Sequence, residues 1–145
     1  MRRVATVAAS LVVVMVLLAL APKSQAQIMH PITADIHHSF IVHDTTLPPG
    51  RYTFRNVQLS NQTVMRVASA DGRTYTDFLV RASDDDHTPK HSELVLSRYG
   101  NKEFLTHIYE RGNKTGVAVV DVSREEADLQ QHGQHAATHT EEQTQ

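Results

Sequence analysis

The stretch ITADIHHSFIVH, at residues 32–43, decides the fold class because apolar side chains recur in it at every second position. One side of the stretch carries Ile32, Ala34, Ile36, His38, Phe40 and Val42. A period of two is typical of a half-buried β-strand. We therefore predict a single strand here, with Ile41 on its outer side, where it can meet a second surface.

Turn residues divide the rest of the chain into further short extended segments. Residues 44–50 include two prolines and a glycine, which interrupt strand pairing because proline lacks an amide donor and glycine tolerates a positive φ. Asp71-Gly72 predicts a tight hairpin. Gly100-Asn101-Lys102 predicts a second hairpin, between strands at residues 93–99 and 103–111.

A short helix is expected near the C-terminus. Ser123 and Glu126 have the spacing of a capping box, and Gly133 weakens the helix beyond it. The six or seven short strands before it predict an all-β fold. We expect an antiparallel β-sandwich of the immunoglobulin or transthyretin-like kind over residues 32–131, with a barrel as the alternative.

The N-terminus has the three parts of a secretory signal peptide. Arg2-Arg3 precedes an apolar run of 18 residues, and Ser24-Gln25-Ala26 supplies the small residues of a cleavage site. We predict cleavage after Ala26, a linker at residues 27–31, and export to the periplasm or the cell exterior. The alternative is a retained anchor, although 18 residues is at the short limit for a membrane span.

Charge argues against one kind of partner, and cysteine content excludes one kind of anchor. Without residues 1–26 the chain keeps 11 basic and 16 acidic residues. The basic residues are scattered singly, which argues against nucleic acid as a partner. The sequence contains no cysteine, so a lipid anchor on cysteine is excluded, and stability has to come from packing and backbone pairing.

Two resemblances agree with this fold. The segment LPPGRYTF, at residues 47–54, resembles the turn-and-strand element of carboxypeptidase-regulatory-like and other prealbumin-like sandwich domains. A longer pattern resembles a group of small exported β-sandwich proteins of soil bacteria and covers residues 32–129. It comprises residues 40–42, 47–54, the 71–72 hairpin, 94–100, 104–109 and 123–126. The resemblance implies a fold and export, and it brings no catalytic or binding residues.

The C-terminal residues 132–145 contain no large apolar side chain and are expected to be disordered. Three histidines of this tail, His132, His135 and His139, would share one face if the tail were helical. Imidazole is a common ligand of transition metals. The tail is therefore a candidate site for Zn²⁺, Cu²⁺ or Ni²⁺, and the alternative is a solvated polar tail.

A charged loop at residues 83–92 is the second candidate metal site. Its possible ligands are Asp84, Asp85, Asp86, His87 and His91. Carboxylate oxygens suit Ca²⁺, but neither the spacing of an EF-hand nor its glycine is present. The alternative is a solubilising loop that protects a sheet edge.

His37 and His38 are adjacent, so on a regular strand they point to opposite faces and cannot chelate one ion. We expect His38 to be a core histidine that is hydrogen-bonded to the backbone. No nucleophile motif or phosphate-binding loop predicts catalysis.

The leading functional hypothesis is an exported, non-catalytic module that either binds an unidentified ligand or is a structural part of the cell envelope, with an unknown protein or envelope component as its partner. A metal-binding protein that uses the histidine tail is second, and a hydrolase is third.

Overall fold

The computed structural model describes residues 28, 30–59, 62–133 and 136–142. The predicted signal peptide, residues 27 and 29 of the predicted linker, and His135 lie outside the described residues. Within the described part, no helix has the length and apolarity needed to cross a membrane.

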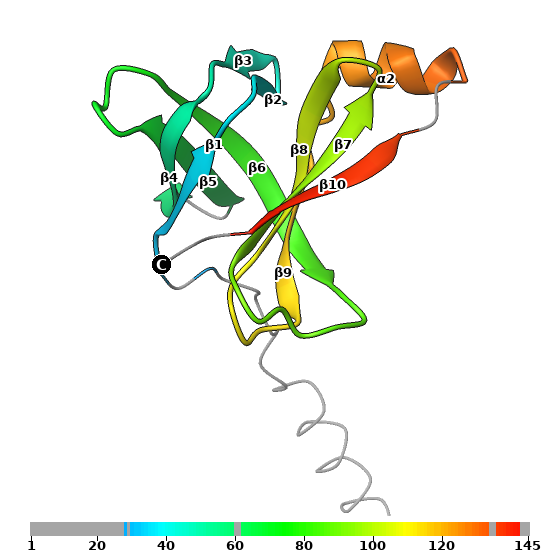
Figure 1. Cartoon of the computed structure of the whole chain (residues 1–145). Coiled ribbons are helices and arrows are strands. Elements are labelled where there is room, and N and C mark those ends of the chain that lie inside the picture. Colours follow the sequence, from blue (N-terminus) through cyan, green and yellow to red (C-terminus); the bar gives the residue numbers. More distant parts are fainter. Residues whose placement is uncertain (1–27, 29, 60–61, 134–135, 143–145) are drawn as a thin grey trace, which may run out of the picture.

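Ten strands and one short helix make up the described part of the chain (Figure 1). The strands are β1 (Ile32–Ile36), β2 (Phe40–Val42), β3 (Thr45–Leu47), β4 (Gly50–Leu59), β5 (Gln62–Ser69), β6 (Tyr75–Asp84), β7 (Glu93–Tyr99), β8 (Lys102–Tyr109), β9 (Thr115–Val119) and β10 (Ala137–Glu142). The helix α2 spans Arg124–Gln131. The all-β class predicted from the sequence is confirmed, whereas the predicted number of six or seven strands is too low.

The strands form one connected sheet in which most neighbours are antiparallel. The order runs β1-β4-β5-β6-β9-β8, and β8 also pairs with β7, which in turn pairs with β10. The short β2 joins β8 through a parallel bridge between Ile41 and Phe104 and pairs with β3 on its other side. Strand β6 makes the corner, because its first half pairs with β5 and its second half with β9.

This sheet is not closed. The antiparallel pairings lead from β1 at one end of the sheet to β10 at the other. These two strands lie near one another, but their backbones do not pair. The predicted barrel is therefore not formed, and the finer prediction of a sandwich stays a prediction. We call the place where β1 and β10 meet the seam of the sheet.

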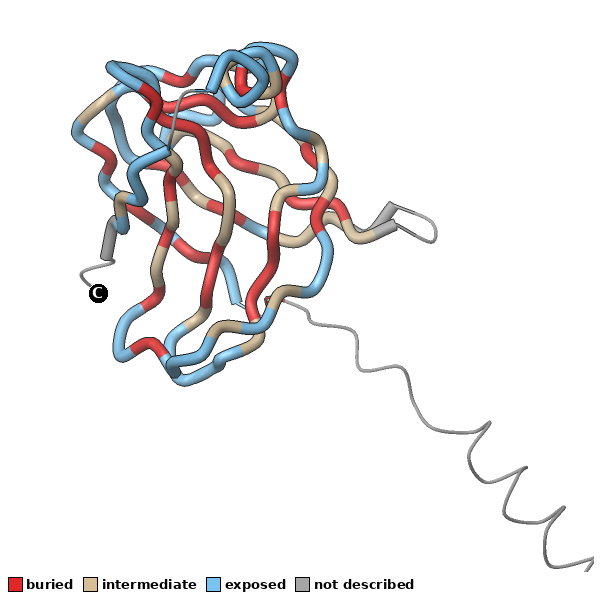
Figure 2. The backbone as a smooth tube through the Cα atoms, turned by 90° about the vertical axis from the view of Figure 1, so that its right-hand side faces the viewer, coloured by how far each residue is buried: buried red, intermediate tan, exposed pale blue. Residues whose placement is uncertain are grey.

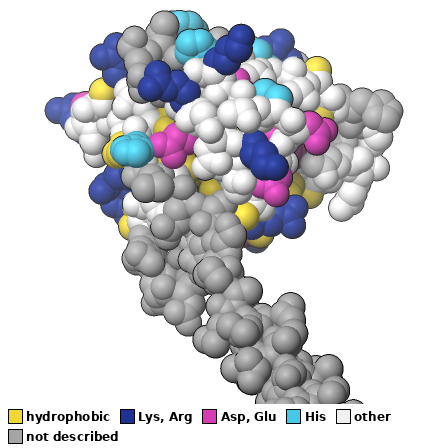
Figure 3. All heavy atoms as spheres, turned by 90° about the horizontal axis from the view of Figure 1, so that it is seen from below, with side chains coloured by type: hydrophobic (Ala, Val, Ile, Leu, Met, Phe, Trp, Pro, Cys, Tyr) yellow, Lys and Arg dark blue, Asp and Glu magenta, His cyan; other side chains and the backbone are white. Residues whose placement is uncertain are grey.

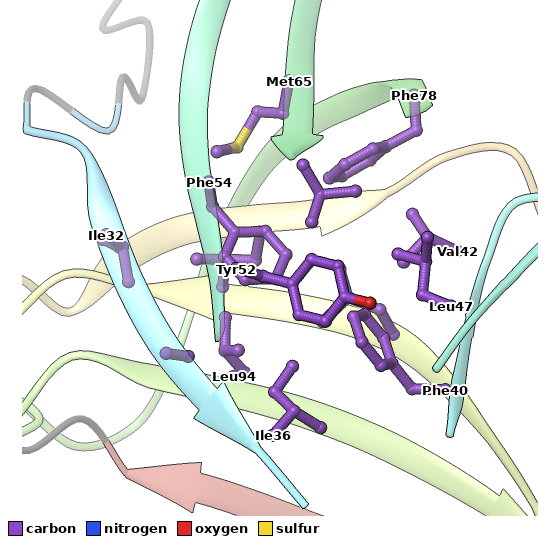
Figure 4. Close-up of a cluster of buried hydrophobic side chains, with 14 of the residues drawn as sticks. Ile32, Ile36, Phe40, Val42, Leu47, Tyr52, Phe54, Met65, Phe78 and Leu94 are labelled. Atoms are coloured by element: carbon purple, nitrogen blue, oxygen red, sulfur yellow. The ribbon is translucent and has the colours of Figure 1, made fainter. Parts of the chain in front are cut away.

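The main hydrophobic core lies inside the bent sheet, where buried residues alternate with exposed ones along the strands (Figure 2). Aromatic side chains dominate it, and Figure 4 shows Phe40, Tyr52, Phe54 and Phe78 converging on one another. Phe40 and Tyr52 pack edge to face with ring centroids 5.2 Å apart. Because the Tyr52 hydroxyl donates to the carbonyl oxygen of Pro48 at 2.7 Å, the buried phenol keeps a polar partner.

A smaller cluster attaches the helix to the sheet. Ile41, Tyr99 and Phe104 are buried together, and Leu129 of α2 packs against them. The second surface suggested for Ile41 is therefore present. The predicted helix is also confirmed, with Ser123 Oγ accepting from the backbone N–H of Glu126 at 3.0 Å.

The prediction of one strand over residues 32–43 is wrong. The alternating stretch is divided into β1 and β2, and residues 37–39 between them are not strand. The division has a topological cause, because β1 pairs with β4 whereas β2 pairs with β3 and β8. His38 therefore lies at a corner of the chain rather than in the middle of a regular strand.

Both predicted hairpins are present. Strands β7 and β8 are joined at Gly100-Asn101, and Lys102, predicted to lie in the turn, is already the first residue of β8. Strands β5 and β6 enclose Asp71-Gly72, but the connection spans residues 70–74 and is longer than a two-residue turn. Gly72 has a φ of 69°, which a side chain would disfavour.

The expectation of a disordered tail is wrong for residues 137–142. These residues form β10, which pairs antiparallel with β7 from Ala137↔Arg98 to Glu142↔Glu93. The physical reason is that β7 would otherwise end the sheet with unpaired backbone groups. A polar segment can satisfy these groups without contributing to the core.

Candidate metal centre

Three side chains from distant parts of the sequence meet at the seam between β1 and β10. His38 lies in the corner that follows β1, Glu103 lies near the start of β8, and His139 lies in β10. One imidazole nitrogen from each histidine and one carboxylate oxygen of Glu103 all lie within 4.8 Å of one another. No other group of three such ligands occurs in the described ranges.

The sheet register brings these side chains together. Glu103 lies opposite Arg98 in the β7–β8 pair, and His139 lies opposite Leu96 in the β7–β10 pair. Leu96 and Arg98 are two positions apart on β7, so they point to the same face of the strand. Glu103 and His139 therefore approach that face from the two sides of β7, and His38 reaches it from the neighbouring corner.

Glu103 is the central residue of the group. Its side chain is only 5% exposed, whereas those of His38 and His139 are 29% and 35% exposed. Glu103 Oε2 contacts Nε2 of His38, and Glu103 Oε1 lies 3.4 Å from Nδ1 of His139. The imidazole rings of the two histidines are tilted by 41°, with their centroids 5.4 Å apart. The carboxylate therefore lies between two imidazoles at the edge of the core.

Arg98 holds the Glu103 carboxylate from the β7 side. Its Nε and Nη2 atoms both donate to Oε1 of Glu103. A buried carboxylate is costly without such a partner. The ion pair also fixes the direction of the carboxylate, in the way that outer hydrogen bonds orient metal ligands.

The structure separates the three histidines proposed in the tail. His132 is the C-terminal cap of α2, and its Nδ1 atom lies 2.8 Å from the carbonyl oxygen of Asp128. His135 lies outside the described residues. His139 is in β10 and belongs to the group with His38 and Glu103. The proposed shared helical face is therefore not formed, because the chain after α2 becomes a strand.

The aspartate loop uses its side chains for local contacts instead of gathering them around one point. Asp84 accepts from the Thr115 hydroxyl at 2.6 Å. Asp85 Oδ1 lies 2.7 Å from Nδ1 of His87, whose Nε2 is 3.6 Å from Glu93. This contact raises the pKa of His87, mainly through its hydrogen bond with Asp85. Asp86 and His91 are exposed.

Sequence reasoning missed two members of the group. The prediction that His38 is a core histidine bonded to the backbone is wrong, because its side chain is partly exposed and contacts Glu103. The sequence predicts for Glu103 only a place in the strand at residues 103–111. A useful signal was present in the sequence, since both ionisable residues occupy positions where the alternating pattern calls for apolar side chains, and an unpaired charge there would be costly.

Comparisons of the chain with protein-family models, with curated proteins and with solved structures find no match. The two resemblances noted in the sequence therefore stay predictions. The candidate site has to be interpreted from its own geometry.

One face of the molecule carries side chains of both charges. On the face seen in Figure 3, acidic, basic and histidine side chains are interspersed. Such a face lacks the continuous basic patch that binds nucleic acid.

Proposed function

We propose that this protein is an exported binding protein for a divalent transition-metal ion, which His38, Glu103 and His139 hold at the seam of the sheet. The single observation that carries the proposal is the convergence of three ligand atoms within 4.8 Å. This function specifies a ligand for the binding module expected from the sequence. It keeps His139 of the predicted tail site and replaces its predicted partners with His38 and Glu103.

The chemistry of the donors favours Zn²⁺, Ni²⁺ or Cu²⁺. Imidazole nitrogen suits Zn²⁺, Ni²⁺ and Cu²⁺, and Zn²⁺ also accepts a carboxylate oxygen, whereas Ca²⁺ prefers six to eight oxygens. Tetrahedral zinc with bonds of about 2.0–2.1 Å requires ligand atoms roughly 3.3 Å apart. The 3.4 Å separation between Oε1 of Glu103 and Nδ1 of His139 matches this requirement. His38 Nε2 lies closer than this to Oε2 of Glu103, so these two side chains have to separate to admit the ion.

The chain positions two of the three ligands, Glu103 and His139, before the ion arrives. Arg98 orients the Glu103 carboxylate, and backbone pairing of β10 with β7 sets the position of His139. Such pre-organisation reduces the entropy that is lost on binding. Each ligand belongs to a different element, so the bound ion would join the β1 corner, β8 and β10.

Calorimetric titration of the purified protein with Zn²⁺, Ni²⁺ and Cu²⁺ tests the proposal. We expect one ion per chain with a Kd below about 10 μM for at least one of these metals. His38→Ala should weaken this binding at least about 100-fold, because removing a ligand costs more than removing an outer partner.

The neighbouring histidine provides the matched control. His37 is exposed and belongs to neither the group nor its contacts, so His37→Ala should bind the ion like the unmodified protein. Equal losses in both variants, or binding weaker than about 1 mM for all three metals, would overturn the proposal.

A further inference from the structure

A polar pocket opens beside the candidate metal centre. It has a volume of about 430 Å³ and is lined by His38, Ser39, Arg98, Gly100, Asn101 and Glu103. Two of these residues, His38 and Glu103, are also proposed metal ligands. An ion held by the group would therefore lie at the wall of this pocket.

The ion would keep an unfilled coordination position. Structural zinc sites are closed by four protein ligands, whereas three protein ligands leave room for water or another molecule. The chain contains no cysteine, and within the described residues no fourth histidine or carboxylate joins the group. The fourth ligand therefore has to come from outside this group.

The charges around the pocket favour an anion as that ligand. A divalent ion, the Glu103 carboxylate and the Arg98 guanidinium together carry a net positive charge. Arg98 is 47% exposed, and its guanidinium has five N–H donors, more than one carboxylate oxygen can use. Ser39 and Asn101 add neutral hydrogen-bonding groups to the lining.

The lining also favours a polar ligand, because it contains no aliphatic or aromatic hydrocarbon side chain. We infer that the pocket binds a small carboxylate or oxyanion that coordinates the metal ion and pairs with Arg98. This inference rests on the proposed metal function and adds a small anion as a second bound species beside the metal ion. The protein would thus take up a metal ion together with a small anion.

Cobalt offers a direct test, because the visible absorption of Co²⁺ changes when its ligands change. The protein is saturated with Co²⁺ and titrated separately with succinate and with sulfate, and calorimetry is recorded in parallel. We expect at least one anion to change the Co²⁺ absorption and to bind with a Kd near or below about 1 mM. The two arms distinguish a carboxylate ligand from an oxyanion ligand.

Arg98→Gln, also saturated with Co²⁺, should bind the anion at least about tenfold more weakly, because a charge-assisted hydrogen bond is lost. The matched control is Arg73→Gln, on the β5–β6 turn, where the arginine side chain is 87% exposed. This control should bind the anion like the unmodified protein, and the metal-free protein should bind it more weakly than the Co²⁺-loaded one.

An unchanged Co²⁺ spectrum with both anions up to about 10 mM would overturn the inference and leave the metal function intact. Equal anion binding by Arg98→Gln and Arg73→Gln would overturn it as well. Failure of Co²⁺, Zn²⁺, Ni²⁺ and Cu²⁺ to bind at all would instead overturn the proposed function and, with it, this inference.

Discussion

Strand β7 has two neighbours of opposite character. On one side, β8 contributes Phe104, Leu105 and Ile108, which are all at most 3% exposed. On the other side, the described side chains of β10 are exposed at Ala137, Thr138 and Thr140, and only that of His139 is partly buried. The two pairings thus have similar backbone bonds and very different side-chain packing.

The difference indicates what holds each strand in place. Burial of apolar surface stabilises the β8 side, at about 25 cal/mol per Å². The β10 side has backbone hydrogen bonds, each of which contributes only about 0.5–1.5 kcal/mol net, together with the contacts of His139. We therefore expect the docking of β10, unlike that of β8, to depend on what His139 binds.

The largest expected effect is on the β8 side. Ile108→Ala should lower the free energy of unfolding by about 2–5 kcal/mol, because a fully buried side chain is replaced by a cavity. Thr138→Ala on β10 should change it by no more than about 0.5 kcal/mol. Urea unfolding measures both values, and comparable losses in the two variants would show that β10 is packed as firmly as β8.

The next effect should be confined to the β10 side. If the ion binds only when β10 is docked, Zn²⁺ at 100 times its Kd adds about 2.7 kcal/mol to that docking. Backbone amides of residues 137–142 should then exchange with deuterium about 100-fold more slowly, while those of β8 are little changed. Hydrogen-exchange mass spectrometry with and without Zn²⁺ measures this difference.

Two histidine variants complete that experiment. His139→Ala should abolish the zinc-dependent protection of β10, whereas His132→Ala should retain it, because His132 bonds to Asp128 and lies outside the group. Protection that persists in His139→Ala would mean that the ion acts on β10 from another site.

The smallest effect concerns α2, the helix that precedes β10. Burial raises the pKa of the Glu126 carboxyl, and a hydrogen bond from Gln130 opposes this more weakly. The folded state therefore favours the protonated form. Glu126 therefore stabilises the folded state fully below the ordinary carboxyl pKa, and this stabilisation is lost as the pH rises through the raised pKa of Glu126.

Glu126→Gln imitates the protonated form. Relative to the unmodified protein it should gain stability at pH 7, and its stability should vary less with pH above the ordinary carboxyl range. Thermal unfolding measured on both sides of that range tests the prediction. A loss of stability in the variant that is equal at low and neutral pH would contradict it.

Local patterns in the sequence predicted much of the fold. The alternation that begins at Ile32 indicated the all-β class, Asp71-Gly72 and Gly100-Asn101 marked two hairpins, and Ser123 marked the start of a helix. Each of these features depends on residues that are close together in the chain, because turn geometry and capping are local properties. The division of residues 32–43 was missed because it depends on which distant strands pair with each half.

The candidate site was predictable only in part, for the same reason. His139 was recognised as a possible ligand, but its proposed partners were neighbours in the tail. The partners in the structure, His38 and Glu103, are brought to it by the pairing of β7 with both β8 and β10. β10 pairs with β7 because β7 would otherwise be an unpaired edge of the sheet, and the composition of the tail does not reveal that such an edge exists.

X-ray absorption at the zinc edge of the one-to-one complex tests the central claim most directly. We predict two imidazole nitrogens at about 2.0–2.1 Å together with oxygen ligands, and one imidazole nitrogen in His139→Ala. The contrary result would be an unchanged spectrum with two imidazoles in a variant that lacks both His38 and His139. Zinc would then be bound by other histidines, and the seam would not be the metal centre.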